Sequence, residues 1–414
     1  MTRSTVKPVA LAAEPQRVAE IDTLRGFALF GIVVVNSIYI GSTFRATTLA
    51  DPAADGPLQL FVSHVVTGLF ETKFFLLFSF LFGYSFTLQL DSADRRGRPF
   101  AGAFTRRLLG LALIGVAHAV LLYTGDILTT YAVLGLVLLA CSRMRPRSAL
   151  LVASALVAVV ALFFAALALA VAFDPEAVST AAETSRALQA AEAYRAGPAR
   201  VIAQHLAELP ALLISTWGYQ APCALAAFLV GLAAGKHHLL SDIAAHKSSL
   251  RKLIFIGLLI GLPGAVFFAW SRSHPGTTVE AIGFAVDAVT APSLAAAYAS
   301  LVLLATTYRR TATASALLAP AGRTALSNYI AQSLLLALVF TGYGAGLINR
   351  FGPVETLVTA TAIYLLLATA STWWTARYHY GPLEWLLRAA THLMTPAWRR
   401  TNSPTAQPSS TPGA

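Results

Sequence analysis

Charged side chains are scarce in this chain of 414 residues. Asp, Glu, Lys and Arg make up 12% of the sequence, whereas a soluble domain carries about 25%. Hydrophobic residues make up 56%, and the mean hydropathy is +0.65. This composition excludes an ordinary soluble protein and predicts a membrane protein with several spans. Because lipid offers the backbone no hydrogen-bond partner, we expect an all-α bundle of membrane helices.

Cysteine is also scarce, and Cys141 and Cys223 both lie in apolar runs. Neither a disulfide framework nor a thiolate metal site is therefore indicated. The segment GKHHLLSDIAAHKSSLRK holds three histidines without metal-ligand spacing, so we interpret it as a basic loop and expect no metal. The chain lacks G-x-S-x-G, H-E-x-x-H and a phosphate-binding glycine loop. The sequence therefore carries no motif of an α/β-hydrolase, a zinc metalloprotease or a P-loop nucleotide-binding protein.

Long apolar runs are what the sequence contains instead, and about ten of them are long enough to span a bilayer. No removable signal is evident before the first, which we interpret as a membrane helix. The predicted spans are 24–41, 72–90, 104–123, 126–141, 148–172, 211–235, 251–270, 281–305, 324–346 and 354–375.

These spans divide the chain into two membrane bundles with a polar connection between them. The connection mixes Ala, Glu and Arg and is predicted to be an amphipathic helical segment at the outer surface, while the C-terminal end is rich in Pro, Ser and Thr. The predicted parts are a cytoplasmic tail at 1–20, a bundle at 21–173, the extracytoplasmic connection at 174–210, a second bundle at 211–400 and a disordered tail at 401–414.

The loop charges indicate how the chain is oriented. When the N-terminus is placed in the cytoplasm, the cytoplasmic segments receive all but seven of the 30 Lys and Arg residues, as the positive-inside rule requires. We therefore predict both termini in the cytoplasm, and we attribute the net charge of +11 to these segments rather than to a nucleic-acid partner. The seven on the other side are Arg45, Lys73, Arg186, Arg195, Arg200, Arg272 and Arg350.

A basic residue and a deeper polar residue recur at one spacing in two spans. Asn36 follows Arg25 by eleven residues in the first span, and His118 follows Arg107 by eleven in the third. Eleven helical residues rise roughly 16 Å, which predicts similar depths for Asn36 and His118 in the outer half of the membrane. Such side chains normally face the interior of a bundle.

His118 has two interpretations. It is either a core histidine that ties helices together, for example by bonding Asn36, or a general base that is reached from the outside. Asp126 opens the next span and would orient the imidazole, although the spacing places it about one and a half turns higher.

Two further sets of polar residues lie near the membrane surfaces. Lys73 lies two residues after Glu71 at the predicted outer end of the second span. It has two interpretations: a snorkelling lysine with a surface partner, or a cation that holds an acceptor or an oxyanion. The ninth span begins GRTALSNYIAQS and places Arg323 and Asn328 in its cytoplasmic half. Its polar side chains form either interhelical hydrogen bonds or a vestibule in which Arg323 binds phosphate.

Three stretches resemble one family of membrane proteins. They are RVAEIDTLRGFALFGIVVVN, then KFFLLFSFLFGYSF with HAVLLYTGDILTTYAVLGLVLL, and finally GRTALSNYIAQS with YGPLEWLLR. Together they resemble the YeiB-like bacterial membrane proteins, which contain domain of unknown function 418, over most of the chain. That family is similar to transmembrane acyltransferases such as the lysosomal heparan glucosaminide acetyltransferase, which move an acyl group from acyl-CoA to a sugar across a membrane.

The resemblance implies an acyltransferase in the bacterial cell membrane that moves an acyl group, in the first instance acetyl, from cytoplasmic acyl-CoA to an extracytoplasmic acceptor. Acyl-CoA would be a substrate, and no cofactor is expected. Related acyltransferases carry a histidine where this sequence has Asn36, which makes His118 the candidate base. The alternatives are an exporter or transporter of a small polar or lipid-linked molecule, and a non-catalytic membrane component. The catalytic candidates are His118, Asp126, Asn36 and Lys73, and the donor-binding candidates are Arg25, Arg107, Arg323 and Asn328.

The predicted topology can be tested with reporter fusions. Fusions after Arg96 and Arg310 should report the cytoplasm, whereas fusions near Asp51 and Ala190 should report the exterior, because the charge bias alternates with each span. A cytoplasmic signal at Ala190 would invert the second half of the chain and contradict the predicted depths.

Overall fold

The computed structural model describes residues 19–173 and 180–400, except 46, 48 and 50, and for 180–182 it describes the backbone only. The predicted all-α class is confirmed, since helices form the structure and the described residues contain no β-sheet. The predicted tails lie outside the described residues, apart from the first helical residues at 19–20. The first eight helices are α1 (Ala19–Gly41), α2 (Pro57–Leu69), α3 (Lys73–Arg95), α4 (Phe100–Leu121), α5 (Leu128–Ala140), α6 (Pro146–Phe173), α7 (Thr180–Arg195) and α8 (Pro198–Ser215).

The second half of the chain contributes seven more helices. They are α9 (Ala221–Lys236), α10 (Lys247–Ser271), α11 (Thr278–Thr306), α12 (Ala312–Arg323), α13 (Ala325–Phe340), α14 (Pro353–Arg377) and α15 (Pro382–His392). Eight helical segments within the described part of the chain are long and apolar enough to cross a membrane, and two apolar helical segments, Leu128–Arg143 and Ala325–Phe340, are shorter. These ten lie where the ten spans were predicted, while the number that cross the bilayer stays a prediction.

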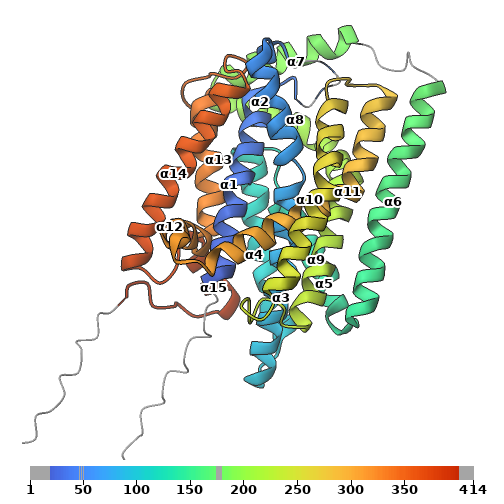
Figure 1. The fold of residues 1–414 in the computed structure, drawn as a ribbon. Helices are drawn as coiled ribbons and strands as arrows, with labels where there is room; N and C mark the ends of the chain where they lie inside the picture. Colours follow the sequence, from blue (N-terminus) through green and yellow to red (C-terminus); the bar gives the residue numbers. More distant parts are fainter. Residues whose placement is uncertain (1–18, 46, 48, 50, 174–179, 401–414) are drawn as a thin grey trace, which may run out of the picture.

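The sixth predicted span differs most from the structure. It was expected to begin at 211 after a surface connection, but α8 continues through a π-helix (Thr216–Gln220) into α9, so that one helical segment runs from Pro198 to Lys236. Pro210 lies inside α8 without ending it. The rest of the connection is α7 at the upper end of Figure 1, and 174–179 lie outside the described residues.

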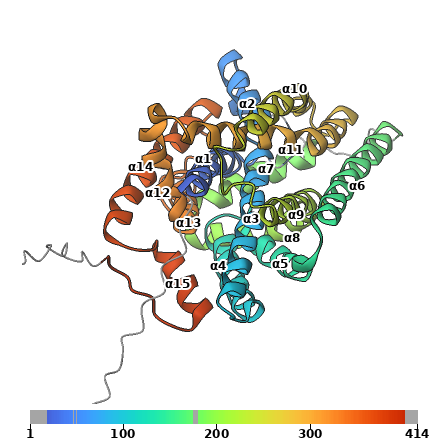
Figure 2. The same cartoon turned by 60° about the horizontal axis from the view of Figure 1, so that its bottom comes forward.

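Helices from the two halves of the chain interleave. In Figures 1 and 2, α1, α3 and α9 lie in the middle, whereas α6 lies at the edge and buries only four of its 28 residues. At the crossing of α3 and α9, a Cβ atom on Gly83 would lie 2.1 Å from the carbonyl oxygen of Phe228, and one on Gly231 would lie 2.2 Å from that of Phe80. Only glycine permits this approach, which is a common way for helices to pack in lipid.

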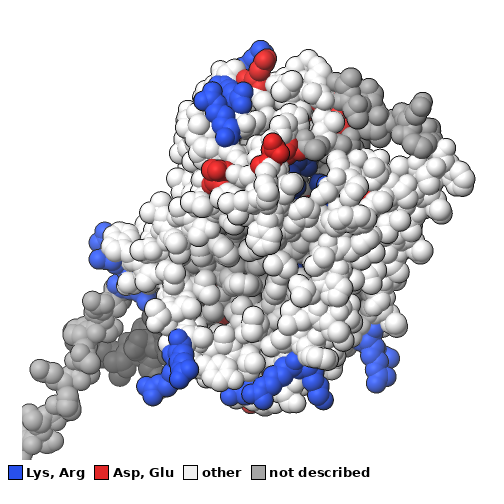
Figure 3. Space-filling view, turned by 45° about the horizontal axis from the view of Figure 1, so that its top comes forward, with Lys and Arg blue, Asp and Glu red and all other residues white. Residues whose placement is uncertain are grey.

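Charge is distributed in bands over the surface. Figure 3 shows basic side chains along the lower rim, a broad uncharged band above them, and both acidic and basic side chains near the upper end. The beginning of α1 and all of α15 lie at the lower end in Figure 1. The uncharged band is the belt that lipid would cover, and the basic rim agrees with the predicted cytoplasmic side.

The first turns of α13 and α15 cap each other. Glu384 Oε1 accepts hydrogen bonds from the amides of Leu326 at 2.7 Å and Ser327 at 3.1 Å, and Ser327 Oγ donates to Glu384 Oε2 at 2.6 Å. In return, Ser327 Oγ accepts a bond from the amide of Leu383 at 3.0 Å. Each helix therefore satisfies amides that the other's first turn leaves without an intrahelical partner, and the carboxylate lies between two positive helix ends.

Removal of this cap should destabilise the end of the bundle at which α13 and α15 begin. Glu384→Ala leaves the amides of Leu326 and Ser327 without acceptors, which should cost about 1–3 kcal/mol, whereas Glu384→Gln keeps a carbonyl acceptor and should cost less. Burial raises the pKa of Glu384 above its ordinary 4.5. Protonation of Glu384 therefore stabilises the folded protein. This stabilisation is fully present below the ordinary glutamate pKa and is lost as the pH rises through the raised pKa of the folded state.

Thermal unfolding of the purified protein in detergent, measured from pH 4 to pH 8, checks both points. The Tm of the wild type should fall as the pH rises above the ordinary glutamate pKa. Glu384→Gln, which has no proton to lose, should not show this fall. An alanine variant as stable as the wild type would contradict the capping role.

Candidate active site

Three side chains from separate elements form a hydrogen-bonded chain in the half of the bundle that was predicted to be the outer one. His118, on the last turn of α4, lies 2.9 Å through Nδ1 from Asp126 Oδ1 and 2.9 Å through Nε2 from Ser333 Oγ on α13. The side chain of Asp126 is 3% exposed, and His118 and Ser333 are 2% and 1% exposed. The structure therefore joins His118 to Asp126, and it adds Ser333, which the sequence had marked only as one polar residue among several on its span.

The turn between α4 and α5 brings Asp126 down to His118. The predicted span began at 126, but α5 begins at Leu128, so Asp126 lies in the turn that folds back over the end of α4. Its second oxygen, Oδ2, accepts the amide of Thr129 at 2.7 Å in the first turn of α5. The carboxylate is thus held by a helix end on one side and by the imidazole on the other.

The bonds of Asp126 assign the proton on the imidazole. An ionised carboxylate only accepts hydrogen bonds, so Nδ1 of His118 carries the hydrogen and Nε2 has the lone pair. Ser333 Oγ must then donate its proton to Nε2. This order, carboxylate to imidazole to hydroxyl, is the arrangement in which a histidine can activate a serine as a nucleophile. Because both ring nitrogens are occupied, Asn36 is not the partner of His118.

Several buried polar atoms on the elements that carry these three residues make no hydrogen bond within the described structure. They are both amide atoms of Gln332, the Thr129 hydroxyl, and the hydroxyl of Tyr329, whose oxygen faces the backbone amide of Ile127. The Tyr329 ring centre lies 4.9 Å from that of His118. Leaving such groups unpaired costs about 1–3 kcal/mol each, so we expect water or a polar ligand to bind them in the working protein.

Asn36 lies apart from these bonds. It is half-buried on α1, and it makes no hydrogen bond within the part of the chain that the structure describes. Its predicted role beside His118 stays a prediction. No three His, Cys, Asp or Glu side chains among the described residues come together in a way that could hold a metal ion.

Two of the predicted donor-binding arginines meet on α3. Arg25 donates to Ser85 Oγ at 2.5 Å and to Asp22 Oδ1 at 2.8 Å, and Arg107 donates to Gln89 Oε1 at 2.5 Å, one turn further along α3. The charge of Arg25 acts on Arg107, as does that of Arg388 on α15. Residues from α1 and α4 thus form a basic cluster at the end of the bundle that the loop charges predict to be cytoplasmic.

The other two donor-binding candidates lie where α12 meets α13. Arg323 is the last residue of α12. The Asn328 side-chain amide donates to Ala321 O, Thr324 Oγ1 and Ser371 Oγ at 2.9–3.1 Å. This bonding ties α12, α13 and α14 together, as the interhelical alternative proposed from the sequence requires.

Lys73 begins α3 directly after a strained turn. Thr72 has φ 70° and ψ −48°, and the Lys73 amide donates to Glu71 O at 2.8 Å. Together these features form a γ-turn of the rare, strained type with positive φ at its central residue. Lys73 Nζ donates to Asp287 Oδ1 at 2.5 Å, and both side chains are fully buried. Lys73 therefore does not extend to the surface as a snorkelling lysine, and it belongs to a different cluster from His118.

The partners of Lys73 were not identified from the sequence. Asp287 Oδ2 also accepts the hydroxyl of Tyr219 at 2.9 Å, and Tyr219 lies on the π-helix. An aspartate within the apolar run 281–305 is a signal that could have indicated the pair, because ionisable groups inside spans need partners. The tyrosine carried no comparable signal, since its position depends on the π-helix.

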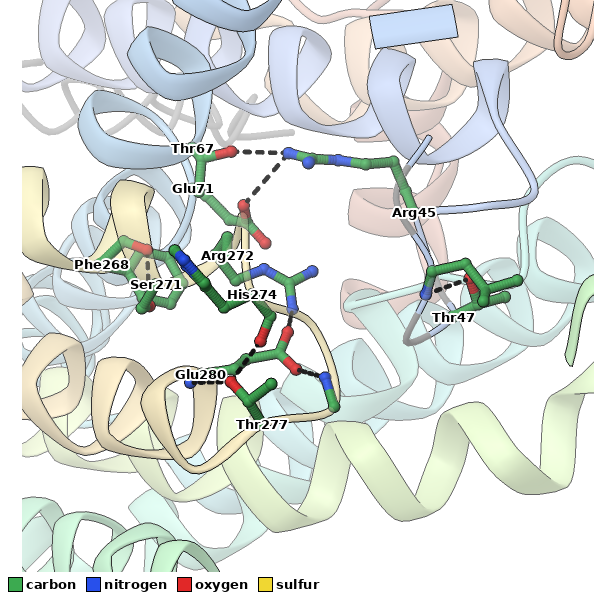
Figure 4. A network of polar contacts seen from close by, with 12 residues as sticks. Arg45, Thr47, Thr67, Glu71, Phe268, Ser271, Arg272, His274, Thr277 and Glu280 are labelled. Carbon is green, nitrogen blue, oxygen red and sulfur yellow. Dashed lines mark hydrogen bonds and ion pairs between the residues drawn. The ribbon is translucent and has the colours of Figure 1, made fainter. Parts of the chain in front are cut away.

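A third polar cluster, shown in Figure 4, lies at the end of the bundle opposite to Arg25 and Arg107. Glu71 accepts the hydroxyl of Tyr39 and lies 3.8 Å from Arg45, whose Nη2 donates to Thr67 Oγ1 at 2.7 Å. Beside it, Arg272 pairs with Glu280, which also accepts the amide of Gly276 at 2.7 Å. The two guanidinium groups face two carboxylates, so the charges of this cluster balance.

Comparison with known proteins finds relatives over nearly the full length of the chain. Residues 234–394 match the family described as "Protein of unknown function (DUF418)". The uncharacterized protein YxaH of Bacillus subtilis is 29% identical over 395 residues, which cover 91% of this chain and 95% of YxaH. The uncharacterized protein YeiB of Escherichia coli is 26% identical over 394 residues, which cover 91% of this chain and 96% of YeiB. No solved structure matches the chain significantly.

The buried pair of Lys73 and Asp287 should matter strongly for stability. Lys73→Ala leaves an uncompensated carboxylate in the bundle, which should destabilise the protein by about 3–5 kcal/mol, whereas a double variant that removes both charges should recover much of this loss. Thermal unfolding of Lys73→Met, Asp287→Asn and the double variant measures the coupling between the two residues. Additive losses would show that the two charges do not depend on each other.

Proposed function

The chain belongs to the YeiB-like DUF418 family of multi-pass membrane proteins, and we propose that it is an acyltransferase of the bacterial cell membrane. It moves an acyl group from a thioester donor on the cytoplasmic side, acyl-CoA, to a hydroxyl or amine acceptor on the other side. The observation that carries this proposal is the hydrogen-bonded chain of Asp126, His118 and Ser333. A histidine held in this tautomer is a general base, and acyl transfer requires one to take a proton from the attacking group.

The position of the hydrogen-bonded residues Asp126, His118 and Ser333 in the bundle supports acyl transfer across a membrane. Along α4, His118 is eleven residues from Arg107, a rise of roughly 16 Å. The basic cluster of Arg25 and Arg107 at the cytoplasmic end suits the phosphates of acyl-CoA, because guanidinium groups bind phosphate through paired hydrogen bonds. The thioester would then extend from this cluster toward His118 between α1, α3 and α4.

The surroundings of His118 support the same chemistry. Lipid and the helices packed around the bonded chain exclude bulk water, which protects a reactive acyl group from hydrolysis. The Tyr329 hydroxyl supplies a hydrogen-bond donor close to the reacting atoms, since the Tyr329 ring centre lies 4.9 Å from that of His118. Such donors stabilise the charge that develops on a carbonyl oxygen during acyl transfer.

An exporter or transporter is the second candidate, and the buried Lys73 and Asp287 favour it. A fully buried ion pair beside a π-helix is an arrangement that ion-coupled transport can use, because protonation of the aspartate would break the pair. Transport would then depend on Asp287 and be insensitive to His118, whereas acyl transfer has the opposite dependence.

Acyl transfer can be measured in vesicles from cells that express the protein. Acetyl-CoA with a labelled acetyl group is supplied on the cytoplasmic face, and label is followed into glycans and lipids on the other face. His118→Ala should lower transfer by about 10²–10⁴-fold, the usual contribution of a general base. Asp126→Asn should lower it as well, because the amide can hold the imidazole in the wrong tautomer.

His64→Ala is the matched control, since His64 lies outside the bonded chain and bonds Leu60 and Ser273 at the outer end. It should transfer acetyl at the wild-type rate. Tm values for all variants separate loss of catalysis from loss of folding. A stable His118→Ala protein with undiminished transfer would remove His118 from the mechanism.

A further inference from the structure

We propose that Ser333 carries the acyl group covalently between donor and acceptor, so that transfer proceeds in two steps through an acyl-serine. This inference rests on the proposed acyltransferase function and names the group that reacts first. Ser333 lies halfway along α13, eight residues from its first residue, and it is 1% exposed. It bonds the one ring nitrogen of His118 that can accept a proton.

The hydrogen bond itself favours the serine over an external acceptor. Asp126 occupies Nδ1, so Nε2 is the only lone pair available to a general base. Ser333 holds that lone pair, and a direct mechanism would require the acceptor to displace a buried hydroxyl before each turnover. When Ser333 is itself the nucleophile, the observed contact is already the first proton-transfer contact.

A covalent carrier also fits substrates that arrive from opposite faces of a membrane. An acyl-serine allows the donor to leave before the acceptor arrives, so the two need never occupy the bundle together. Burial beneath the turn of Tyr123, whose ring centre lies 6.3 Å from that of His118, keeps water from the ester. Two-step transfer thus divides one difficult transmembrane reaction into two local ones.

Tyr329 provides a donor for the acyl carbonyl. It precedes Ser333 by one helical turn and lies on the same face of α13. Tyr329 is 4% exposed, its phenol oxygen faces the backbone amide of Ile127, and its hydroxyl hydrogen has no acceptor within the described residues. A carbonyl oxygen on Ser333 would give this donor the acceptor that it lacks.

The two steps balance as follows. Ser333 Oγ attacks the thioester carbon while its proton moves to His118 Nε2; the carbon–sulfur bond breaks, and the proton passes from Nε2 to the departing thiolate. The acceptor hydroxyl or amine then gives a proton to Nε2 and attacks the acyl carbon. The bond to Ser333 Oγ breaks, and the proton on Nε2 returns to the serine. No oxidant, reductant or metal takes part.

The experiment traps the intermediate in the full-length purified protein in lipid nanodiscs. Labelled acetyl-CoA is added without acceptor, the protein is denatured in acid, and peptides are analysed by mass spectrometry. We expect acetyl on the peptide that contains Ser333, and we expect it to be lost in Ser333→Ala and His118→Ala. Ser37→Ala is the matched control, because Ser37 is a buried helical serine that bonds only Val34 O in its own helix.

Two further variants keep the test decisive. Ser333→Cys should form a thioester, which neutral hydroxylamine cleaves faster than the wild-type ester, even if Ser333→Ala folds poorly. Tyr329→Phe should slow acetylation by about 10²-fold, the loss measured for one oxyanion donor, without lowering Tm.

The outcomes separate this inference from the proposed function. Transfer to the acceptor at the wild-type rate in folded Ser333→Ala would overturn the covalent step and leave a direct acyltransferase. A wild-type protein that neither takes up acetyl nor transfers it would overturn both. Acetyl on Ser333 that an acceptor removes, with the acetylated acceptor as product, would establish both.

Discussion

Hydrocarbon offers no hydrogen-bond partner, and the polar side chains inside this bundle are therefore held by one another. His118 depends on Ser333, Lys73 on Asp287, and Asn328 on Ser371. The first two pairs join helices that are far apart in the sequence, and the third joins the consecutive helices α13 and α14. A helix that carried one of these residues alone would leave it unsatisfied in lipid. The polar pairs thus specify which helices must meet, while close glycine contacts such as those between α3 and α9 determine how near they come.

The two buried clusters differ in how completely their atoms are bonded. Around Lys73, both oxygens of Asp287 have donors, and the ammonium group also faces the ring of Phe268 at 5.0 Å. Beside His118, the hydroxyl hydrogen of Tyr329 has no acceptor among the described residues. A complete network stabilises a fold, whereas an incomplete one has bonds left for a ligand. This contrast is why we assign the chemistry to His118 rather than to Lys73.

Helix α3 connects the regions that the proposed reaction needs. Its C-terminal half, which is predicted to face the cytoplasm, holds Arg25 and Arg107 through Ser85 and Gln89. In its middle, Ser79 bonds the hydroxyl of Tyr131 at 2.6 Å and so fixes α5, the helix that follows Asp126. Its first residue is Lys73, directed inward by the turn at Thr72. The donor end and the reacting end are therefore anchored to one central, well-buried helix.

The sequence by itself determined the all-α membrane class and the approximate position of each apolar helix, while the similar depths of Asn36 and His118 stay a prediction. Composition, periodicity and the rise of a helix are local properties, and they depend little on what packs against them. Asp126 and Lys73 were also recognised as candidates, because ionisable groups stand out in apolar runs. Only the tertiary structure decided that His118 bonds Asp126 and Ser333 instead of Asn36, and that Lys73 pairs with Asp287. Such contacts depend on the rotation of each helix about its axis and on irregular backbone at 122–127, Thr72 and the π-helix, none of which has a periodic signature in the sequence.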